Sequence, residues 1–184
     1  MARTETPACE EGMRAPGFSL TDTTGKTLSL DDLRGPRGTL VMFICNHCPY
    51  VKAVLTRLIA DCRLLKEEGV GCVAIMSNDV TDYPEDSPEN MARLARELDF
   101  PFPYLLDPTQ EVARAYGAVC TPDFFGFDKD LELRYRGRLD AGLKEPPPAD
   151  APRELLEAMR RIAAGKAPAG QVPSMGCSIK WKNA

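Results

Sequence analysis

A run of six apolar or β-branched residues, 39–44, leads directly into the segment 45–49, and this junction restricts the fold more than any other feature of the chain. The run has the length and composition of a buried strand, and Gly38 precedes it. Pro49 suits the first position of a helix, because its φ is fixed and it has no N–H to leave unpaired. The sequence therefore predicts a strand, a short turn and a helix that begins directly after Cys48.

The predicted helix places Cys48 at its N-cap. Apolar residues then recur with the spacing of one buried helix face: Val51, Val54, Leu55, Leu58, Cys62 and Leu65. Gly69 follows at a position where helices commonly end. A cysteine at the N-cap lies beside unpaired backbone N–H groups and the positive end of the helix dipole, which favours its thiolate. Because the thiolate is the form that attacks disulfides and peroxides, this position predicts thiol redox chemistry.

Composition and charge exclude several classes of protein. The 184 residues are 43% hydrophobic and 27% charged, which suits one globular domain. A net charge of −4 without a Lys/Arg cluster argues against nucleic acid as a partner. No apolar run approaches the ~20 residues of a membrane span, and the N-terminal residues lack the apolar core of a secretory signal. We therefore expect a cytoplasmic protein with no membrane partner.

The seven cysteines favour a reduced protein with one or two reactive pairs over a secreted disulfide scaffold, because their number is odd and the chain is long enough to fold without cross-links. Cys45 is the natural partner of Cys48. A tight turn across three positions brings two Cα atoms within the ~4.4–6.8 Å that a disulfide requires. Cys62 and Cys72 lie in apolar patterns and are predicted to be small buried side chains.

The rest of the chain alternates strand-like and helix-like segments. This alternation, followed by a hairpin and a last helix, predicts an α/β sandwich with a mixed sheet. The predicted strands are 18–20, 27–30, 70–76, 102–106, 124–127 and 131–136, and the predicted helices after the first are 88–98, 110–116 and 155–162.

Several blocks of the chain resemble the thioredoxin-fold redoxin superfamily, and within it a peroxiredoxin-like subgroup of the AhpC/TSA type. The blocks are 15–20, 45–51, 77–79, 83–86, 120–123, 135–138 and 176–181. The resemblance implies a thioredoxin-like three-layer sandwich, a mixed β-sheet flanked by helices with an N-terminal β-hairpin extension. We expect a flexible tail at 1–14, a thioredoxin-like domain at 15–164, and a C-terminal extension at 165–184 that packs on the domain.

The resemblance also implies roles for residues near Cys48. Thr121 and Pro122 resemble the cis-proline loop of thioredoxins, which implies a cis bond at Pro122 and a place for substrate beside Cys48. Cys120 precedes this loop, and Cys177 lies in a tail that folds back over the site if the extension packs there. Cys120 and Cys177 are therefore further possible redox partners of Cys48.

The departures from the family patterns shift the expected activity. When the strand at 39–44 is aligned with the thioredoxin strand that precedes the active site, Cys48 takes the position of the first thioredoxin cysteine. The Cys-x-x-Cys of this chain therefore lies three residues upstream of its usual place. Met42 replaces the buried acid of thioredoxins. The hydroxyl residue and the proline that peroxiredoxins place before their cysteine fall at Cys45 and Val41. We therefore expect a thiol-disulfide oxidoreductase without a cofactor, and a thiol peroxidase with Cys48 as the peroxidatic residue as the alternative.

Two other classes of function use the same residues. Cys45, His47 and Cys48, with Cys120 or Cys177, offer ligands that suit copper or zinc, which predicts a metallochaperone as an alternative. A redox-inert binding module is the third possibility. His47 either lowers the pKa of Cys48 or is an exposed loop residue. Substrates are expected to be protein or small-molecule disulfides or peroxides, with an electron donor that the sequence leaves open.

Two groups of polar residues are expected to have structural and not catalytic roles. The loop residues Asn78, Asp79, Asp82, Tyr83 and Asp86 are interpreted as turn formers and helix caps, with Ser87 before Pro88 as the cap itself. Arg136 and Arg138, on either side of Gly137, are interpreted as surface charges.

Overall fold

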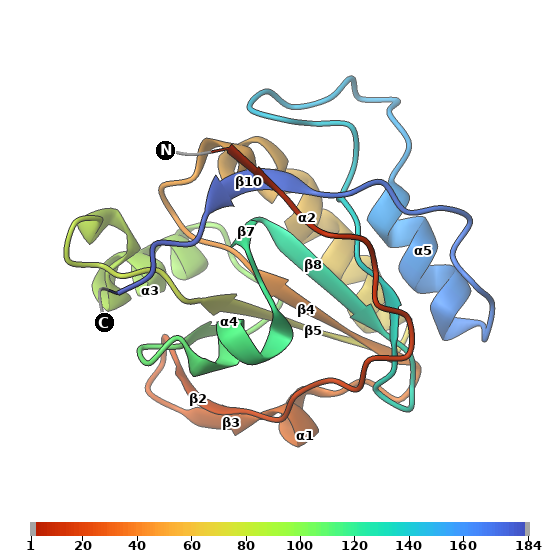
Figure 1. Cartoon of the computed structure of the whole chain (residues 1–184), viewed down its shortest axis with the longest axis horizontal. Helices are drawn as coiled ribbons and strands as arrows, with labels where there is room; N and C mark the ends of the chain where they lie inside the picture. The colour runs from red at the N-terminus through yellow and green to blue at the C-terminus, as the bar shows by residue number, and fades with distance from the viewer. Residues whose placement is uncertain (1–2, 183–184) are drawn as a thin grey trace.

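Strand β4 (Gly38–Phe43) lies at the centre of the fold in the computed structural model, which describes residues 3–182 (Figure 1). All six of its residues are buried. It pairs in parallel with β5 (Val70–Met76) and antiparallel with β8 (Asp123–Phe127). The seven-stranded sheet has the order β3-β2-β6-β5-β4-β8-β9, in which the other strands are β2 (Ser19–Asp22), β3 (Thr27–Ser29), β6 (Tyr104–Leu106) and β9 (Leu133–Tyr135).

Side chains alternate along β4 between two separate hydrophobic cores, as the period of two in a strand requires. Leu40 and Met42 belong to the core under the long helix α2, whereas Val41 and Phe43 belong to the core on the opposite face. The first core also takes in residues of α3 and α5, and the second takes in residues of α1 and α4. The helices are α1 (Leu30–Leu33), α2 (Pro49–Glu67), α3 (Pro88–Glu97), α4 (Glu111–Tyr116) and α5 (Glu154–Ala163).

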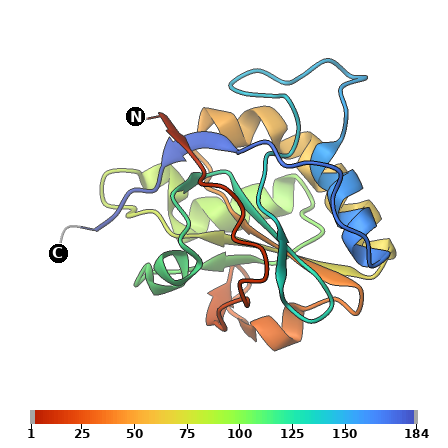
Figure 2. The same ribbon diagram turned by 45° about the vertical axis from the view of Figure 1, so that its right-hand side comes forward.

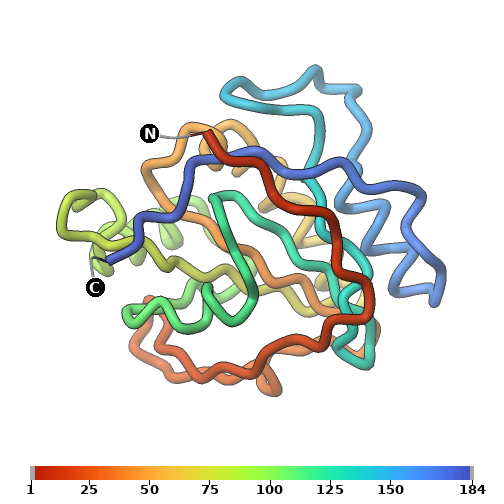
Figure 3. The backbone as a smooth tube through the Cα atoms, viewed as in Figure 1, coloured from red at the N-terminus to blue at the C-terminus, as the bar shows by residue number. Residues whose placement is uncertain are grey.

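A second, three-stranded sheet joins both ends of the described chain to the domain. Its order is β1 (Arg3–Glu5), β10 (Met175–Ser178) and β7 (Cys120–Thr121), and all pairings are antiparallel. Figures 2 and 3 show the N-terminal and C-terminal segments, red and blue, running side by side across the molecule. The sequence predicts a flexible tail at 1–14, but residues 3–5 form a strand instead. They do so because the outer edge of β10 offers unpaired backbone groups.

The predicted thioredoxin-like α/β arrangement is confirmed. The hairpin β2–β3, strand β5 at 70–76, and the helices that begin at Pro49 and Pro88 stand where the sequence places them. Ser87 caps α3 by accepting a hydrogen bond from the Asn90 N–H, as predicted. Between residues 3 and 182, no helix combines the length and the apolar character that crossing a membrane requires.

Gly71 provides a test of how tightly β5 packs on the segment that precedes β4. A Cβ at this position would meet the Leu33 carbonyl oxygen at 2.1 Å and the Gly35 nitrogen at 2.7 Å. Both neighbours are backbone atoms, so Gly71→Ala is expected to lower the free energy of unfolding by about 1–3 kcal/mol, the usual effect of overpacking. Urea denaturation measures the change. Gly17→Ala is the control, because a Cβ there meets nothing within 4 Å, and equal stability of the two variants would contradict the packing described.

Candidate active site

The turn between β4 and α2 holds Cys48 at the N-cap of the helix, as the sequence predicts. Cys48 has an extended backbone conformation, with φ −67° and ψ 122°, and Pro49 is the first helical residue. The Cys48 carbonyl accepts hydrogen bonds from the N–H groups of Val51 and Lys52 at 3.1 and 3.0 Å. Its thiol does not cap the helix. When protonated, it donates instead to the carbonyl oxygen of Thr121 at 3.1 Å, so the sulfur lies against strand β7.

Thr121 contacts both cysteines of the Cys-x-x-Cys segment. Its hydroxyl lies 3.3 Å from the Cys45 sulfur, while its carbonyl oxygen receives the Cys48 thiol. The peptide bond between Thr121 and Pro122 is cis, which confirms the expectation drawn from the resemblance. Cys45 and Cys48 therefore meet one residue of the cis-proline loop, and the role of Thr121 and Pro122 toward substrate stays a prediction.

Opposite pKa shifts separate the two thiols. A hydrogen bond from Cys45 is the main cause that lowers the pKa of Cys48 from 9.0 to about 5. Burial of Cys48 opposes this shift. Hydrogen bonds from Cys177 and the Val51 N–H also lower the pKa, by smaller amounts. Burial also raises the pKa of Cys45 well above its usual value. At neutral pH the site therefore holds a thiolate at Cys48 and a thiol at Cys45, which is the division of charge that an attacking and a resolving cysteine require.

The structure changes the expected origin of the Cys48 thiolate. The sequence predicts the helix N-terminus as a cause, with His47 as a second possible one, whereas the hydrogen bond from Cys45 makes the largest contribution. His47 contacts Cys45, with 3.7 Å between Nδ1 and the sulfur. Its ring is also nearly buried and stacks on Tyr83 at 4.6 Å between centroids. The interpretation of His47 as an exposed loop residue is therefore wrong.

Asp86, which ends the 3-10 helix η1 (Pro84–Asp86), anchors the cysteine turn from the opposite side. One carboxylate oxygen accepts from the backbone N–H groups of Asn46 and His47 at 2.7 and 3.1 Å. The other accepts from His47 Nδ1 at 2.6 Å and from Asn78 Nδ2 at 3.0 Å. Burial alone would raise the pKa of Asp86, but the hydrogen bonds from His47 and Asn78 outweigh it and lower the pKa.

This result corrects the interpretation of the polar loop after β5. Asp86 is fully buried and Asn78 is nearly so, and both bond to the active-site segment or to its neighbours, so they are not merely turn formers. The sequence pattern does not show their place at the site, because Asp86 contacts a segment about forty residues away. One local signal was available: Asn78 follows the end of a buried strand by only two positions, where functional polar residues commonly gather.

Arg136 is also buried and does not serve as a surface charge. Its guanidinium donates to the Asp123 carboxylate at 2.9 and 3.2 Å and to the Gly117 carbonyl at 2.8 Å. It also lies over the Phe125 ring at 4.5 Å. Since Asp123 follows Pro122 directly, this ion pair holds the far end of the cis-proline loop.

The remaining cysteines divide into two groups. Cys177 lies on β10 opposite Thr121 and hydrogen-bonds to Cys48, and burial together with this contact raises its pKa to about 12. The Cys120 thiol instead donates to the Pro122 carbonyl at 3.6 Å, and burial raises its pKa. Cys62 and Cys72 are buried in the core under α2, as predicted.

The possible metal ligands do not form the set that the sequence predicts. In the described part of the chain, the donor atoms that gather within 4.8 Å of one another belong to Cys45, His47 and Asp86, without Cys48. The nitrogen of His47 that lies in this group already bonds to Asp86, and both oxygens of Asp86 accept hydrogen bonds. Nε2 of His47 is buried without a hydrogen-bond partner, but the other donor atoms of the group are engaged within the protein, so this arrangement gives the metallochaperone alternative no support.

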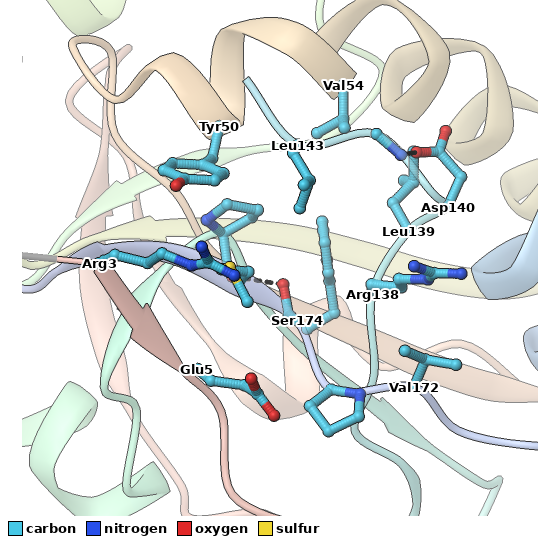
Figure 4. Close-up of a pocket in the computed structure, with 15 residues that line it drawn as sticks. Arg3, Glu5, Tyr50, Val54, Arg138, Leu139, Asp140, Leu143, Val172 and Ser174 are labelled. Atoms are coloured by element: carbon cyan, nitrogen blue, oxygen red, sulfur yellow. Dashed lines mark hydrogen bonds between the residues drawn. The ribbon is translucent and has the colours of Figure 1, made fainter. Parts of the chain in front are cut away.

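A cavity of about 260 Å³ adjoins the cis-proline loop on the side of the three-stranded sheet (Figure 4). Tyr50 and Val54 of α2 line one wall, and Arg3 and Glu5 of β1 line the opposite wall. The Ser174 hydroxyl, which also faces the cavity, donates to the Pro122 carbonyl at 2.9 Å. The cavity is thus lined by both apolar and charged side chains. Two of its lining residues are close in sequence to the site: Tyr50 is two positions after Cys48, and Pro122 follows Thr121.

A sequence model of the AhpC/TSA family matches residues 12–136, which is more than half of the chain. The chain therefore belongs to the AhpC/TSA family. The crystal structure of a thioredoxin domain of a thiol-disulfide oxidoreductase from Bacteroides vulgatus superposes with a TM-score of 0.59 at 19% identity, covering 70% of this chain and 89% of that one. This likeness establishes the thioredoxin fold.

Two similar proteins are named as oxidoreductases. The thiol-disulfide oxidoreductase ResA of Bacillus thuringiensis subsp. konkukian is 30% identical over 128 residues, which make up 66% of this chain and 65% of ResA. A protein of Mycobacterium tuberculosis (strain CDC 1551 / Oshkosh) named as a peroxiredoxin is 29% identical over 67% of this chain and 73% of its own length. These names agree with the predicted enzyme class.

A solved structure resembles the whole chain more closely. The crystal structure of an uncharacterized conserved protein from Geobacillus kaustophilus is 46% identical, with a TM-score of 0.93, and covers 100% of this chain and 98% of its own. The arrangement of both sheets is therefore shared beyond the segment that the family model describes.

The Cys45 hydrogen bond predicts how Cys48 titrates. In the reduced protein, the thiolate absorbance that Cys48→Ser removes is expected to rise with a midpoint near pH 5. Cys45→Ala is expected to move this midpoint upward, because it removes the side chain that makes the largest favourable contribution. Ultraviolet difference titration measures both. A midpoint near the ordinary thiol value of 9.0 in the wild type would contradict the electrostatics described.

The Asp86 carboxylate predicts an acid-dependent loss of stability. Its pKa is lowered in the folded state, so its contribution is present above the unfolded value of 3.8 and is lost as the pH falls through the folded value. Asp86→Asn is therefore expected to lower the free energy of unfolding by about 1.5–3 kcal/mol at pH 7, the range for hydrogen bonds to charged groups. The difference from wild type is expected to shrink below pH 3.8. Urea denaturation at several pH values measures it, with the exposed Asp82→Asn as control; a difference that does not depend on pH would contradict the ionised state of Asp86.

Proposed function

We propose that the protein is a thiol-disulfide oxidoreductase in which Cys48 is the attacking thiolate and Cys45 the resolving cysteine. The observation that supports this most directly is the position of Cys48 at the helix N-cap, with Cys45 and Cys48 both against Thr121. The lowered pKa of Cys48 and the raised pKa of Cys45 agree with these roles. The family membership and the names of the relatives agree with this class of reaction.

The proposed reaction has two exchange steps. The Cys48 thiolate attacks one sulfur of a substrate disulfide, a Cys48–substrate disulfide forms, and the other half of the substrate leaves as a thiolate. Cys45 then loses its proton and attacks the Cys48 sulfur. The Cys45–Cys48 disulfide forms, and the remaining half of the substrate leaves with that proton. The substrate gains two electrons, and an external dithiol must return two electrons to the enzyme.

The proposed substrates are protein or small-molecule disulfides, held beside Cys48 by Thr121 and Pro122. Cys48 is 0% exposed, so a substrate reaches its sulfur only when the surrounding segments open. His47 and Asp86 are proposed as positioning residues, because they hold the turn through the backbone N–H groups of Asn46 and His47.

A thiol peroxidase is the second candidate, and the low pKa of Cys48 together with the relative named as a peroxiredoxin favours it. In that reaction the Cys48 thiolate attacks the terminal oxygen of a hydroperoxide and the O–O bond breaks; with one proton taken up from solvent, a Cys48 sulfenic acid and an alcohol form. The positions at which peroxiredoxins carry a hydroxyl residue and a proline hold Cys45 and Val41 here. A free Cys48 sulfenic acid that forms faster with hydroperoxide than disulfide exchange occurs would favour this second activity.

Single cysteine variants test the proposed roles. Cys48→Ser is expected to reduce disulfide turnover to the uncatalysed rate, because no other thiol of the site has a lowered pKa. Cys45→Ser is expected to slow turnover while a mixed disulfide accumulates on Cys48. Turnover of a small aromatic disulfide with a dithiol donor, combined with mass spectrometry of the intact protein, measures both. Cys9→Ser is the control, and full activity of Cys48→Ser would overturn the proposal.

A further inference from the structure

Cys177 reaches the active site from the opposite end of the chain. Strand β10 pairs with β7 so that the Cα partner of Cys177 is Thr121, the residue whose carbonyl receives the Cys48 thiol. Helix α2 and β10 are in contact, and the cysteines 45, 48 and 177 belong to one hydrophobic core. The three residues are 1%, 0% and 3% exposed. Three thiols are therefore gathered in one shielded cluster around Thr121.

We propose that Cys177 is a third redox thiol of this site, and that Cys48 forms alternative disulfides with Cys45 and with Cys177. The proposal rests on the proposed role of Cys48 as the attacking thiolate. It assigns a function to the C-terminal strand, which lies beyond residue 136, where the match to the family model ends.

The backbone around Cys177 holds it in place for this reaction. A Cβ on Gly176 would meet the Thr121 carbonyl oxygen at 2.1 Å and the Pro122 nitrogen at 3.1 Å, so β10 lies closer to the cis-proline loop than any other residue type would allow. On its outer edge β10 pairs with β1, where Arg3 is the partner of Cys177. Strand β10 is therefore fixed on both sides, and Cys177 shares one hydrophobic core with the Cys48 sulfur with which it is to react.

The proposed step starts from the Cys48–substrate disulfide. Cys177 loses its proton and attacks the Cys48 sulfur; the Cys48–Cys177 bond forms, the bond between Cys48 and the substrate breaks, and the substrate thiol leaves with the proton. The substrate disulfide is reduced to two thiols, and the pair Cys48 and Cys177 is oxidised. The high pKa of Cys177 suits it to this second step, because at neutral pH it does not compete with Cys48 for the first attack.

The two alternative disulfides differ in the length of chain that they enclose. Cys45 and Cys48 are three positions apart, whereas a bond between Cys48 and Cys177 links α2 to the last strand and encloses most of the domain. The Cys48–Cys177 disulfide closes the longer loop, so it restricts the denatured chain more strongly than the Cys45–Cys48 disulfide does and makes it more compact. The Cys48–Cys177 form is therefore distinguishable by faster migration in a non-reducing denaturing gel, which the Cys45–Cys48 form does not show.

The test oxidises the reduced full-length protein with diamide, blocks the remaining thiols with N-ethylmaleimide, and maps the disulfides by mass spectrometry without reduction. Cys45→Ser is expected to hold most of Cys48 in a disulfide with Cys177 and to migrate faster in the gel. Cys177→Ser is expected to form only Cys45–Cys48. Cys120→Ser is the matched control, because this neighbour of Thr121 is buried as well but bonds to Pro122, and it is expected to form both disulfides.

Gly176→Val is a second variant that keeps all seven cysteines. It is expected to displace β10 and to abolish the Cys48–Cys177 disulfide while Cys45–Cys48 still forms, and the Cys45→Ser result decides the matter if this variant does not fold. If the wild type forms Cys45–Cys48 but Cys45→Ser leaves Cys177 as a thiol, the third-thiol proposal is wrong and the proposed function stands. If Cys48 remains unoxidised in the wild type and in Cys45→Ser alike, the proposed function fails, and this proposal fails with it.

Discussion

The placement of the Cys48 sulfur beside Thr121 is the constraint on which the rest of the site depends. It joins the start of α2 to β7, and the same threonine meets Cys45 through its hydroxyl and Cys177 through strand pairing. Buried β4 and the cis-proline loop place these groups together because β4 and β8 are hydrogen-bonded neighbours. The scaffold therefore supplies the position of the thiols, and burial of Cys45 together with its hydrogen bond to Cys48 supplies the difference in pKa.

Charge around the thiols is arranged differently from the pattern that the resemblance implies. The position of the buried thioredoxin acid holds Met42, but Asp86 brings another buried carboxylate to the site from the segment that follows β5. Its hydrogen bonds to two consecutive N–H groups and to the His47 ring tie the cysteine turn to that segment. This carboxylate fixes the turn from outside, whereas the ion pair of Arg136 and Asp123 fixes the cis-proline loop from the other side.

Much of the fold, and the position of Cys48, could be predicted because both depend on local patterns. An apolar run followed by a proline and a helical stripe specifies a strand, a turn and an N-cap without reference to the rest of the chain. The burial of Asp86, of Arg136 and of Cys177 could not be predicted in this way. Each results from a contact between segments distant in sequence, and a polar residue in a loop gives no local sign that a later strand or turn will cover it. The pairing of β1 with β10 was missed for the same reason.

An equilibrium redox titration of the wild-type protein tests the central claim most directly. The protein is equilibrated in dithiol buffers of graded potential, quenched with an alkylating reagent, and mapped cysteine by cysteine by mass spectrometry. The account predicts that Cys48 is present in every disulfide formed at the first transition, joined to Cys45 or to Cys177. A first transition that oxidises other cysteines, such as Cys62 with Cys72, while Cys48 remains a thiol would contradict it.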